Sequence, residues 1–372
     1  MKYYTSDKIR ALNCTYNIII GQRSNGKSYD ALYNGVKDFR ETGAQFAIVR
    51  RWDEDFAKQR GASMFSSLIN NRYGENVISR LTDGEYNDVY YYSRRWYLCR
   101  YDGTLNKRVT DDKPFAYGFS LSAQEHDKST SYNGIKTIIF DEFLTRSVYL
   151  QNEYVLFMNT VSTIARDRDD EIKIFMLGNT VNQYCPYFEE MGLTRIRQQQ
   201  QGTIDVYTMG DPNGKHVKIA VEYCAEMDRK SKTKTSKVDL FCFDNPHLQM
   251  ITGGAWEIEI YPHCPTKYKS TEIIFNFFVN FKNDVLHCEV IAHDDLLFIF
   301  VHPKTSELKN TEKDLIYTTD YSPRPNYRRN ITRPITDTER KIYALFLADK
   351  VFYSDNQTGE IMRNYLLWCK SA

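Results

Sequence analysis

Eight residues near the amino terminus constrain the fold of this chain more than any other feature of its sequence. An apolar run at 16–20 predicts a buried strand, and the helical spacing of apolar residues over 27–40 predicts a helix. Between them the sequence reads Gly21-Gln22-Arg23-Ser24-Asn25-Gly26-Lys27-Ser28, which matches G-x-x-x-x-G-K-S. A glycine-bordered loop in this position turns successive backbone N–H groups inward, where they bind phosphates. The pattern therefore predicts a P-loop, a site for a nucleoside triphosphate.

The residue types in this loop each have an expected role. Gly21 and Gly26 allow the backbone to wrap around phosphate groups because they carry no Cβ atom. The Lys27 ammonium reaches the β- and γ-phosphates, and the Ser28 hydroxyl is a ligand for Mg²⁺. The start of the following helix adds a favourable dipole. ATP and Mg²⁺ are therefore the expected cofactors, and the alternative is a surface glycine turn without a ligand.

A second strand, predicted at 135–140, ends in the acidic couple Asp141-Glu142. A carboxylate in this position can hold the magnesium ion, as the Walker-B aspartate does, and Glu142 can deprotonate an attacking water. The next strand, at 172–177, ends near Asn179, which is either a contact of the γ-phosphate or a turn residue. Two solvated acids at a strand end are the alternative for the couple. Together with the loop, a water-activating glutamate favours an ATPase over a small-molecule kinase.

The order of the predicted elements indicates two folded domains. Strands and helices alternate through the first half, with hairpins in 76–120, and predict an α/β domain with a mainly parallel sheet. Further elements of this half are predicted as a strand at 46–49 and helices at 53–70 and 151–165. In the second half, strands are predicted at 256–261, 273–281, 285–292 and 296–301, and helices at 336–348 and 360–369. The predicted limits are an ATPase domain at 1–226, a basic linker at 227–253 and a small α+β domain at 254–372.

Composition excludes several classes of protein. The 49 Lys+Arg against 48 Asp+Glu give a net charge of +1, which argues against a protein that coats DNA along its whole surface. The chain has no apolar run of the ~20 residues that a membrane span needs, and no secretory signal is expected. The eight cysteines form no Cys-x-x-Cys pair, so buried free thiols are expected rather than zinc sites or disulfides.

Several stretches occur in an order that is characteristic of one protein family. They are Ile20–Tyr29, Gln45–Arg51, Ile138–Phe143, Arg166-Asp167-Arg168, Pro186-Tyr187-Phe188 and 354–357. In these stretches the chain resembles the genome-packaging ATPases of phi29-like tailed phages. The resemblance implies an ASCE-type P-loop ATPase followed by an RNase-H-like domain that has lost its nuclease metal site. It further implies ATP-driven translocation of double-stranded DNA into a procapsid.

The resemblance also implies partners and a place of action. The partners are the portal of the procapsid, double-stranded DNA and further copies of the chain in a homomeric ring, expected to be a pentamer. The place is the host cytoplasm, with transient attachment at the portal vertex and no membrane. Whether a packaging RNA is a further partner is left open by the sequence.

Carried over position by position, the resemblance assigns roles to individual residues. Lys27 and Ser28 bind nucleotide and magnesium, Asp141 is the Walker-B acid and Glu142 is the catalytic base. Two further residues would act across the subunit interface: Arg166 as the trans-acting arginine finger, and Lys128 as a lysine that reaches the neighbouring site. A charged helix end and an ordinary loop lysine are the respective alternatives.

Basic residues at two places are candidates for binding the DNA backbone. Arg50, Arg51 and Lys58 follow a strand of the ATPase domain, and the alternative for them is intramolecular ion pairing. Arg324, Arg328, Arg329 and Arg333 cluster with tyrosines in the second domain, where a solvated loop is the alternative.

The second domain is not expected to cleave DNA. A two-metal nuclease needs clustered carboxylates, beginning with an acid in the first strand. In the strand predicted at 273–281, Asn276 and Asn280 stand where that acid is expected, and the sequence does not show that Asp294-Asp295 and Asp320 converge. The alternatives to a packaging ATPase are a terminase-like motor with an active nuclease and a nucleotide-binding scaffold without turnover.

Overall fold

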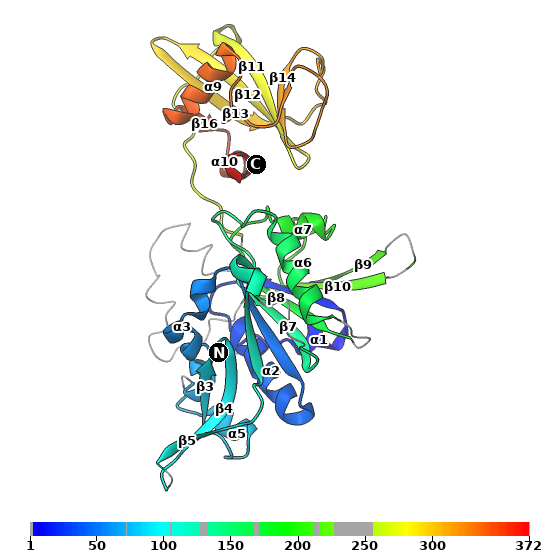
Figure 1. Cartoon of the computed structure of the whole chain (residues 1–372). Coiled ribbons are helices and arrows are strands. Elements are labelled where there is room, and N and C mark those ends of the chain that lie inside the picture. The colour runs from blue at the N-terminus through cyan, green and yellow to red at the C-terminus, as the bar shows by residue number, and fades with distance from the viewer. Residues whose placement is uncertain are drawn as a thin grey trace. The chain divides into compact units, whose positions relative to one another are not determined.

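The protein was analysed as a computed structural model, which describes residues 3–71, 73–104, 106–126, 132–166, 171–210, 214, 216–226 and 256–371. The chain divides into two compact units, Met1–Glu257 and Ile258–Ala372 (Figure 1). The predicted linker at 227–253 and the predicted interface residue Lys128 both lie outside the described residues.

A mainly parallel sheet forms the frame of the first unit. Its described strands follow the order β3-β4-β6-β2-β7-β8-β1-β10-β9, and β5 pairs with β4. The six central strands, in the spatial order β6-β2-β7-β8-β1-β10, are parallel to one another. The outer strands β3, β4, β5 and β9 pair in antiparallel fashion. The strands are β1 Tyr16–Gly21, β2 Gln45–Arg50, β3 Asp88–Tyr92, β4 Arg95–Asp102, β5 Lys107–Thr110, β6 Ala116–Ser120, β7 Ile135–Asp141, β8 Lys173–Asn179, β9 Ile204–Gly210 and β10 His216–Tyr223.

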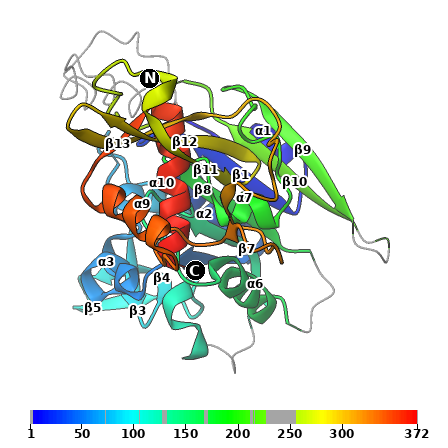
Figure 2. The same cartoon turned by 90° about the horizontal axis from the view of Figure 1, so that it is seen from above.

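Helices cover both faces of this sheet. They are α1 Asp7–Ala11, α2 Lys27–Thr42, η1 Asp53–Phe56, α3 Lys58–Ser63, α4 Ser66–Ile69, α5 Val77–Leu81, η2 Leu121–His126, α6 Glu153–Ile164 and α7 Pro186–Glu190. Both views show α6 and α7 together against one part of the sheet and the β9–β10 pair at its edge (Figures 1 and 2). The single helix predicted at 53–70 is wrong. The extended backbone of Ala57 (ψ 149°) separates η1 from α3, and Phe65 separates α3 from α4.

The alternation of side chains along the central strands explains why they are apolar on both faces. Ile18 and Ile20 of β1 belong to the core that contains Phe157 of α6. Ile19, between them, points to the opposite core, which contains Leu32 of α2. Burial on both faces is typical of parallel strands between two helical layers, and it explains the near-continuous runs of isoleucine, valine and phenylalanine in the sequence.

A mixed sheet and two main helices form the second unit. Among its described residues, the strand order is β15-β14-β11-β12-β13-β16, in which β11, β12 and β13 form an antiparallel meander. The elements are η4 Ser270–Glu272, β11 Ile273–Phe281, β12 Asp284–His293, β13 Leu296–Pro303, β14 Leu315–Thr318, β15 Tyr327–Arg328, α9 Asp337–Leu347, β16 Val351–Tyr353 and α10 Asn356–Ser371. No strand forms at 256–261, contrary to prediction; in this stretch the Glu257 N–H bonds to the Thr180 carbonyl and the Tyr261 N–H to the Asn356 side chain rather than to a neighbouring strand.

Helix α10 covers only one face of the second sheet. Phe277, Val279 and Phe281 of β11 are buried, and the Phe281 ring lies 6.0 Å, between centroids, from that of Tyr365 in α10. Because side chains alternate along a strand, Asn276 and Phe278 point to the other face. The face covered by α10 is therefore lined by apolar side chains of β11, whereas the other face carries the polar Asn276 beside Phe278.

Two general expectations can be compared with the described residues. None of the described helices is long and apolar enough to cross a membrane. Within the described part of the chain, the free cysteines are Cys14, Cys99, Cys185, Cys224, Cys264, Cys288 and Cys369, and all except Cys264 are buried.

Candidate functional site

Parallel pairing brings the polar strand ends of the first unit to one edge. Gly21 at the end of β1 is in register with Asn179 at the end of β8, and Asp141 at the end of β7 is in register with Leu177. Strand β2, which ends at Arg50, pairs with β7 on its other side. The carboxyl edge of a parallel sheet is where open α/β folds bind ligands. In this chain, the glycine loop, the acidic couple and Asn179 all lie at this edge.

The loop between β1 and α2 has the backbone that its glycines predict. Gly26 has φ +101°, a left-handed conformation that is strained for residues with a side chain. A Cβ atom on Gly21 would lie 2.8 Å from the Cβ of Cys224, so the loop packs tightly against the end of β10. Gln22 and Asn25 are buried at 5% and 2% exposure. The glycines therefore bracket a compact loop rather than an open surface turn.

The Lys27 side chain folds back into this loop. Its ammonium donates to the carbonyl oxygens of Gly21 and Gln22, at 3.1 and 2.9 Å, and lies 3.1 Å from Asn25 Oδ1 and 3.3 Å from Asn179 Oδ1. Burial lowers the pKa of Lys27 to about 8, against the opposing influence of Cys224 and Asp141. The structure thus brings a desolvated ammonium to the place that the motif assigns to the phosphates, and it places Asn179 beside it.

Ser28 and Asp141 meet directly. The Ser28 hydroxyl donates to Asp141 Oδ1 at 2.9 Å, and Asp141 is 9% exposed. A hydroxyl and a carboxylate are hard oxygen donors of the kind that Mg²⁺ prefers, with substrate phosphates and waters completing the octahedron. The chemistry of this donor pair fits the predicted magnesium ion.

Arg50 bridges the two acids of the couple. Its Nη2 lies 2.7 Å from Asp141 Oδ2, and its Nη1 lies 2.8 Å from Glu142 Oε2. The Glu142 side chain is 65% exposed, whereas that of Arg50 is 15% exposed. Glu142 has φ +61°, so the backbone turns sharply where the strand ends. The carboxylate that could activate water is therefore open to solvent and oriented by an arginine.

This geometry favours the intramolecular alternative for Arg50 over the predicted DNA contact. Both terminal nitrogens of its guanidinium bond to acids of the same chain, which is the intramolecular alternative. Sequence reasoning did not place Arg50 at the nucleotide site, although a signal was present. Because β2 and β7 both end at the same edge, an arginine that ends β2 lies near the acids that end β7.

For Arg51 the structure likewise favours the intramolecular alternative. Its side chain is 8% exposed, and its Nε and Nη2 bond to the fully buried Glu153 of α6 at 2.7 and 2.9 Å. Its Nη2 also donates to the Phe143 carbonyl at 2.7 Å, and its Nη1 donates to the Glu142 carbonyl at 3.3 Å. Arg51 therefore ties the chain beyond the acidic couple to α6.

The remaining loop residue, Arg23, points away from the acidic couple. Its side chain is 55% exposed, and its Nη2 lies 3.5 Å from Glu257 Oε1. Arg23 and Ser24 stay candidate nucleotide contacts through their loop position. Among the described residues, Gln22 Oε1 and Arg50 Nε are buried without a hydrogen-bond partner. At this edge of the sheet, Gln22 therefore offers an unpaired acceptor and Arg50 an unpaired donor.

The other basic candidates of this unit lie on the surface. Arg166 is exposed just beyond the end of α6, and Lys58 is exposed at the start of α3. Their predicted roles, in a neighbouring subunit's site and on DNA respectively, stay predictions.

In the second unit, two of the candidate arginines are held by their own fold. Arg328 Nε lies 2.8 Å from an oxygen of the buried Glu339. The Arg329 guanidinium lies 3.9 Å from the ring centroid of Tyr321, and its Nε donates to the Thr319 carbonyl. These contacts favour structural roles for both. Arg324 is exposed and donates to Thr311 Oγ1 at 3.1 Å.

Comparisons of sequence connect the chain to viral packaging proteins. Residues 102–209 match the family described as Podovirus DNA encapsidation protein (Gp16). The chain is 29% identical over 189 residues to the DNA packaging proteins of Bacillus phages PZA and phi29, a match that covers 50% of this chain and 49% of theirs. The chain is thus similar in sequence to DNA packaging proteins of phi29-like phages. With the DNA packaging protein of Bacillus phage B103 it shares 30% identity over 180 residues, 48% of each chain.

The matched region spans about half the length of these curated relatives. Solved structures extend the likeness of the fold to the whole chain. The Phi-28 gp11 DNA packaging motor matches with a TM-score of 0.52 at 15% identity, covering 99% of this chain and 98% of that one. The bacteriophage Phi-29 viral genome packaging motor assembly matches with a TM-score of 0.54 at 20% identity, covering 100% and 99%. The predicted resemblance and the predicted fold class are thereby confirmed.

Proposed function

We propose that this chain is an ATPase that drives double-stranded viral DNA into a procapsid. The observation that carries the proposal is the meeting of the glycine loop with the acidic couple, through the 2.9 Å hydrogen bond from Ser28 to Asp141. The sequence relationship to DNA packaging proteins supports DNA as the polymer that is moved. The fold shared with packaging motors over the whole chain supports the same assignment.

In the proposed reaction, the loop binds the triphosphate through its backbone N–H groups. Lys27 exchanges its contacts with the Gly21 and Gln22 carbonyls for the β- and γ-phosphates, which favour its charged form. Ser28 and Asp141 would hold Mg²⁺, which supplies neutralisation of the charge on the phosphate oxygens. Glu142, exposed and next in sequence, accepts the proton of the attacking water. Asn179 orients either the Lys27 ammonium or that water.

The motor is proposed to be a ring of identical subunits at the portal. In such a ring, Arg166 is proposed to reach the site of a neighbouring subunit, where an arginine stabilises charge in the transition state. The proposal includes Lys128 as a second trans-acting residue and a pentamer as the ring size. The second unit has the docking role, because the strand β11 contains no aspartate or glutamate for a nuclease metal site.

Hydrolysis in the presence of DNA tests the proposal. Purified chain is expected to hydrolyse ATP faster when double-stranded DNA of any sequence is added. Glu142→Gln is expected to lower kcat by roughly 10²–10⁴-fold, the range for removing a general base, while nucleotide still binds. Lys27→Ala should lose nucleotide binding. Glu41→Gln, an exposed acid on α2 paired only with Lys37 at 3.8 Å in the described structure, is the matched control and should hydrolyse normally.

Three outcomes would reject the proposal in different ways. Hydrolysis that Glu142→Gln leaves unchanged would remove the assigned base. Nucleotide binding without turnover, with or without DNA, would favour the scaffold. Cleavage of plasmid DNA with Mg²⁺ or Mn²⁺ would favour the terminase-like motor with an active nuclease.

A mixing experiment tests the trans role of Arg166. Arg166→Ala and Lys27→Ala are each expected to be inactive as pure proteins. In mixed rings, some interfaces combine an intact loop with an intact arginine from the neighbour, so hydrolysis should reappear. If Arg166 acts within its own subunit, no mixture will exceed the sum of its components.

A further inference from the structure

Three side chains with metal-binding atoms gather on the face of the second sheet opposite Phe277 and Val279. His287 and His302 are direct partners across the β12–β13 ladder, and Glu289 follows His287 by two residues on the same face. Cross-strand partners and residues two apart are neighbours on one side of a sheet. The topology therefore brings together two imidazoles and one carboxylate that are separated by up to 15 positions in the sequence.

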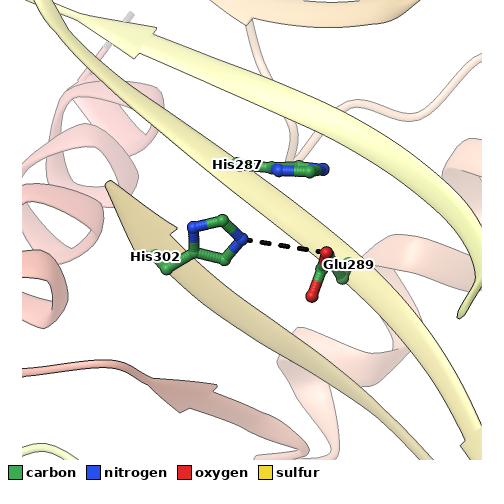
Figure 3. Close-up of side chains that lie close together, drawn as sticks. All are labelled: His287, Glu289 and His302. Atoms are coloured by element: carbon green, nitrogen blue, oxygen red, sulfur yellow. Dashed lines mark ion pairs between the residues drawn. The ribbon is translucent and has the colours of Figure 1, made fainter. Parts of the chain in front are cut away.

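The ligand atoms of these residues lie within 4.8 Å of one another, and each side chain is partly buried. His302 Nε2 is 3.8 Å from Glu289 Oε1, and the two imidazole ring centroids are 4.8 Å apart. Figure 3 shows His302 turned toward Glu289, with His287 above the carboxylate. Ligand atoms at ~2.0–2.2 Å from a tetrahedral ion are ~3.3–3.6 Å from one another. Side-chain movements of about 1 Å would therefore bring these ligand atoms to metal-binding distances.

Neighbouring residues orient two of the three groups. A ring nitrogen of His287 is 2.8 Å from Asn276 Oδ1, and the ring stacks on Phe278 with 4.8 Å between centroids. The Tyr268 hydroxyl donates to Glu289 Oε2 at 2.5 Å. Hydrogen bonds of this kind fix the rings and carboxylates that ligate metals in proteins.

We propose that His287, Glu289 and His302 form a binding site for a divalent transition-metal ion of the zinc class. Two imidazoles and one carboxylate suit Zn²⁺, and its substitutes Co²⁺ and Ni²⁺, better than Mg²⁺ or Ca²⁺, which prefer oxygen ligands throughout. The site is separate from the magnesium donors Ser28 and Asp141, which belong to the other unit. A bound ion would clamp β12 to β13, and its fourth position is left to water.

The rival explanation is a metal-free cluster. The nearby Glu289 carboxylate raises the pKa of His302, and the two groups can form an ion pair without a metal. Stacking on Phe278 accounts for His287 in that case. The two explanations differ in what an added ion does, since only a metal site gains stability from it.

Cobalt binding to the untagged full chain tests the site. Titration with Co²⁺ in excess Mg²⁺, which occupies oxygen-rich sites, is expected to give visible d–d absorption at one ion per chain. Thiolate charge-transfer bands should be absent from this spectrum, because the proposed ligands include no cysteine. Zn²⁺ should displace the cobalt and raise the unfolding midpoint of the second unit.

Substitutions identify the ligands. His287→Phe keeps the aromatic stack on Phe278, and His302→Gln keeps a polar side chain. Each is expected to weaken cobalt binding by roughly tenfold or more, and the metal-free unfolding midpoint of each variant reports whether it folds. His263→Gln, which alters an imidazole that is bonded to the Tyr353 carbonyl, should bind cobalt as the parent does.

Two results would overturn the proposal. One is the absence of stoichiometric cobalt absorption in the parent chain. The other is binding that survives unchanged in folded His287→Phe and His302→Gln, which would place the ion on other residues. Neither result bears on hydrolysis of ATP, so the proposal stands or falls separately from the proposed function.

Discussion

Replacing Glu153 by glutamine is expected to loosen the sheet edge that carries the acidic couple. The Glu153 carboxylate is fully buried and accepts hydrogen bonds from Arg51, from the Tyr187 hydroxyl at 2.9 Å and from the Leu150 N–H at 2.8 Å. The same arginine donates to the carbonyls of Glu142 and Phe143. Neutralising Glu153 leaves a buried guanidinium whose only remaining acceptors are neutral.

The size of the effect follows from this burial. Removing one partner of a buried ion pair costs about 3–5 kcal/mol of unfolding free energy. For a unit of the size of Met1–Glu257, a loss of this size lowers the melting midpoint by about 6–10 °C. The double variant Arg51→Met/Glu153→Gln removes both charges and keeps an amide beside the Tyr187 hydroxyl and the Leu150 N–H, so it should recover part of the loss.

Equilibrium unfolding of Glu153→Gln, Arg51→Met and the double variant completes the cycle that measures the coupling between the two charges. The control is Arg60→Met, which breaks an exposed pair with Asp55 (3.5 Å) and should cost under about 1 kcal/mol. Folded Glu153→Gln is further expected to show a lower kcat with little change in nucleotide affinity, because Arg51 anchors the backbone of Glu142. A loss below about 1 kcal/mol, or a double variant that loses the sum of both singles, would refute the reasoning.

Three further changes have expected outcomes. Arg50→Gln frees the carboxylate of Asp141 from a competing cation, so the Mg²⁺ concentration for half-maximal hydrolysis should fall about fivefold, equivalent to about 1 kcal/mol; an unchanged or higher value contradicts this. Folding lowers the pKa of Lys27 from 10.5 to about 8, so the unfolded chain binds this proton more tightly than the folded chain does. Without nucleotide, the free energy of unfolding should therefore increase as the pH is raised from about 8 to 10.5. ATP favours the charged ammonium, so calorimetry above about pH 8 should detect proton uptake on binding and weaker affinity; binding without proton uptake across this range contradicts this. Gly35→Ala puts a Cβ 2.6 Å from the Phe46 ring and should cost about 1–3 kcal/mol in a denaturant titration; a neutral result would show that the helix–sheet contact relaxes.

Local patterns predicted most of the parallel sheet and the residues that meet at its edge. The runs that became β1, β2, β7 and β8 are continuous and apolar, because strands between two helical layers are buried on both faces. Their polar ends then fall at one edge by topology alone. That is why Lys27 and Asp141 could be assigned to one site from the sequence.

Predictions failed where the outcome depends on long-range contacts. The region 53–70 has helical periodicity, but its short helices pack separately beneath Trp96 and Phe115, and the chain is extended at Ala57. The strands β9 and β10 were not predicted, because β10 is recruited by pairing with β1 and β9 by pairing with β10. Which strand a segment pairs with depends on packing against distant residues and has little effect on the local amino-acid composition.

The basic residues show the same limit. A charged side chain at a strand end can face DNA or an acid of the next strand, and only the fold decides between them. Arg50 pairs with Asp141 and Arg51 pairs with Glu153, and each partner is about a hundred positions away in the sequence. The cluster of His287, Glu289 and His302 was missed for a related reason, since it requires the register of β12 on β13.

A structure of the chain with a slowly hydrolysed ATP analogue and Mg²⁺ tests the central claim most directly. The account predicts the β- and γ-phosphates inside the loop from Gly21 to Ser28, with the ion about 2.1 Å from Ser28 Oγ. Lys27 should leave the Gly21 and Gln22 carbonyls for phosphate oxygens, and Glu142 should face the γ-phosphate. An analogue bound elsewhere, with Lys27 still on those carbonyls, would contradict the account.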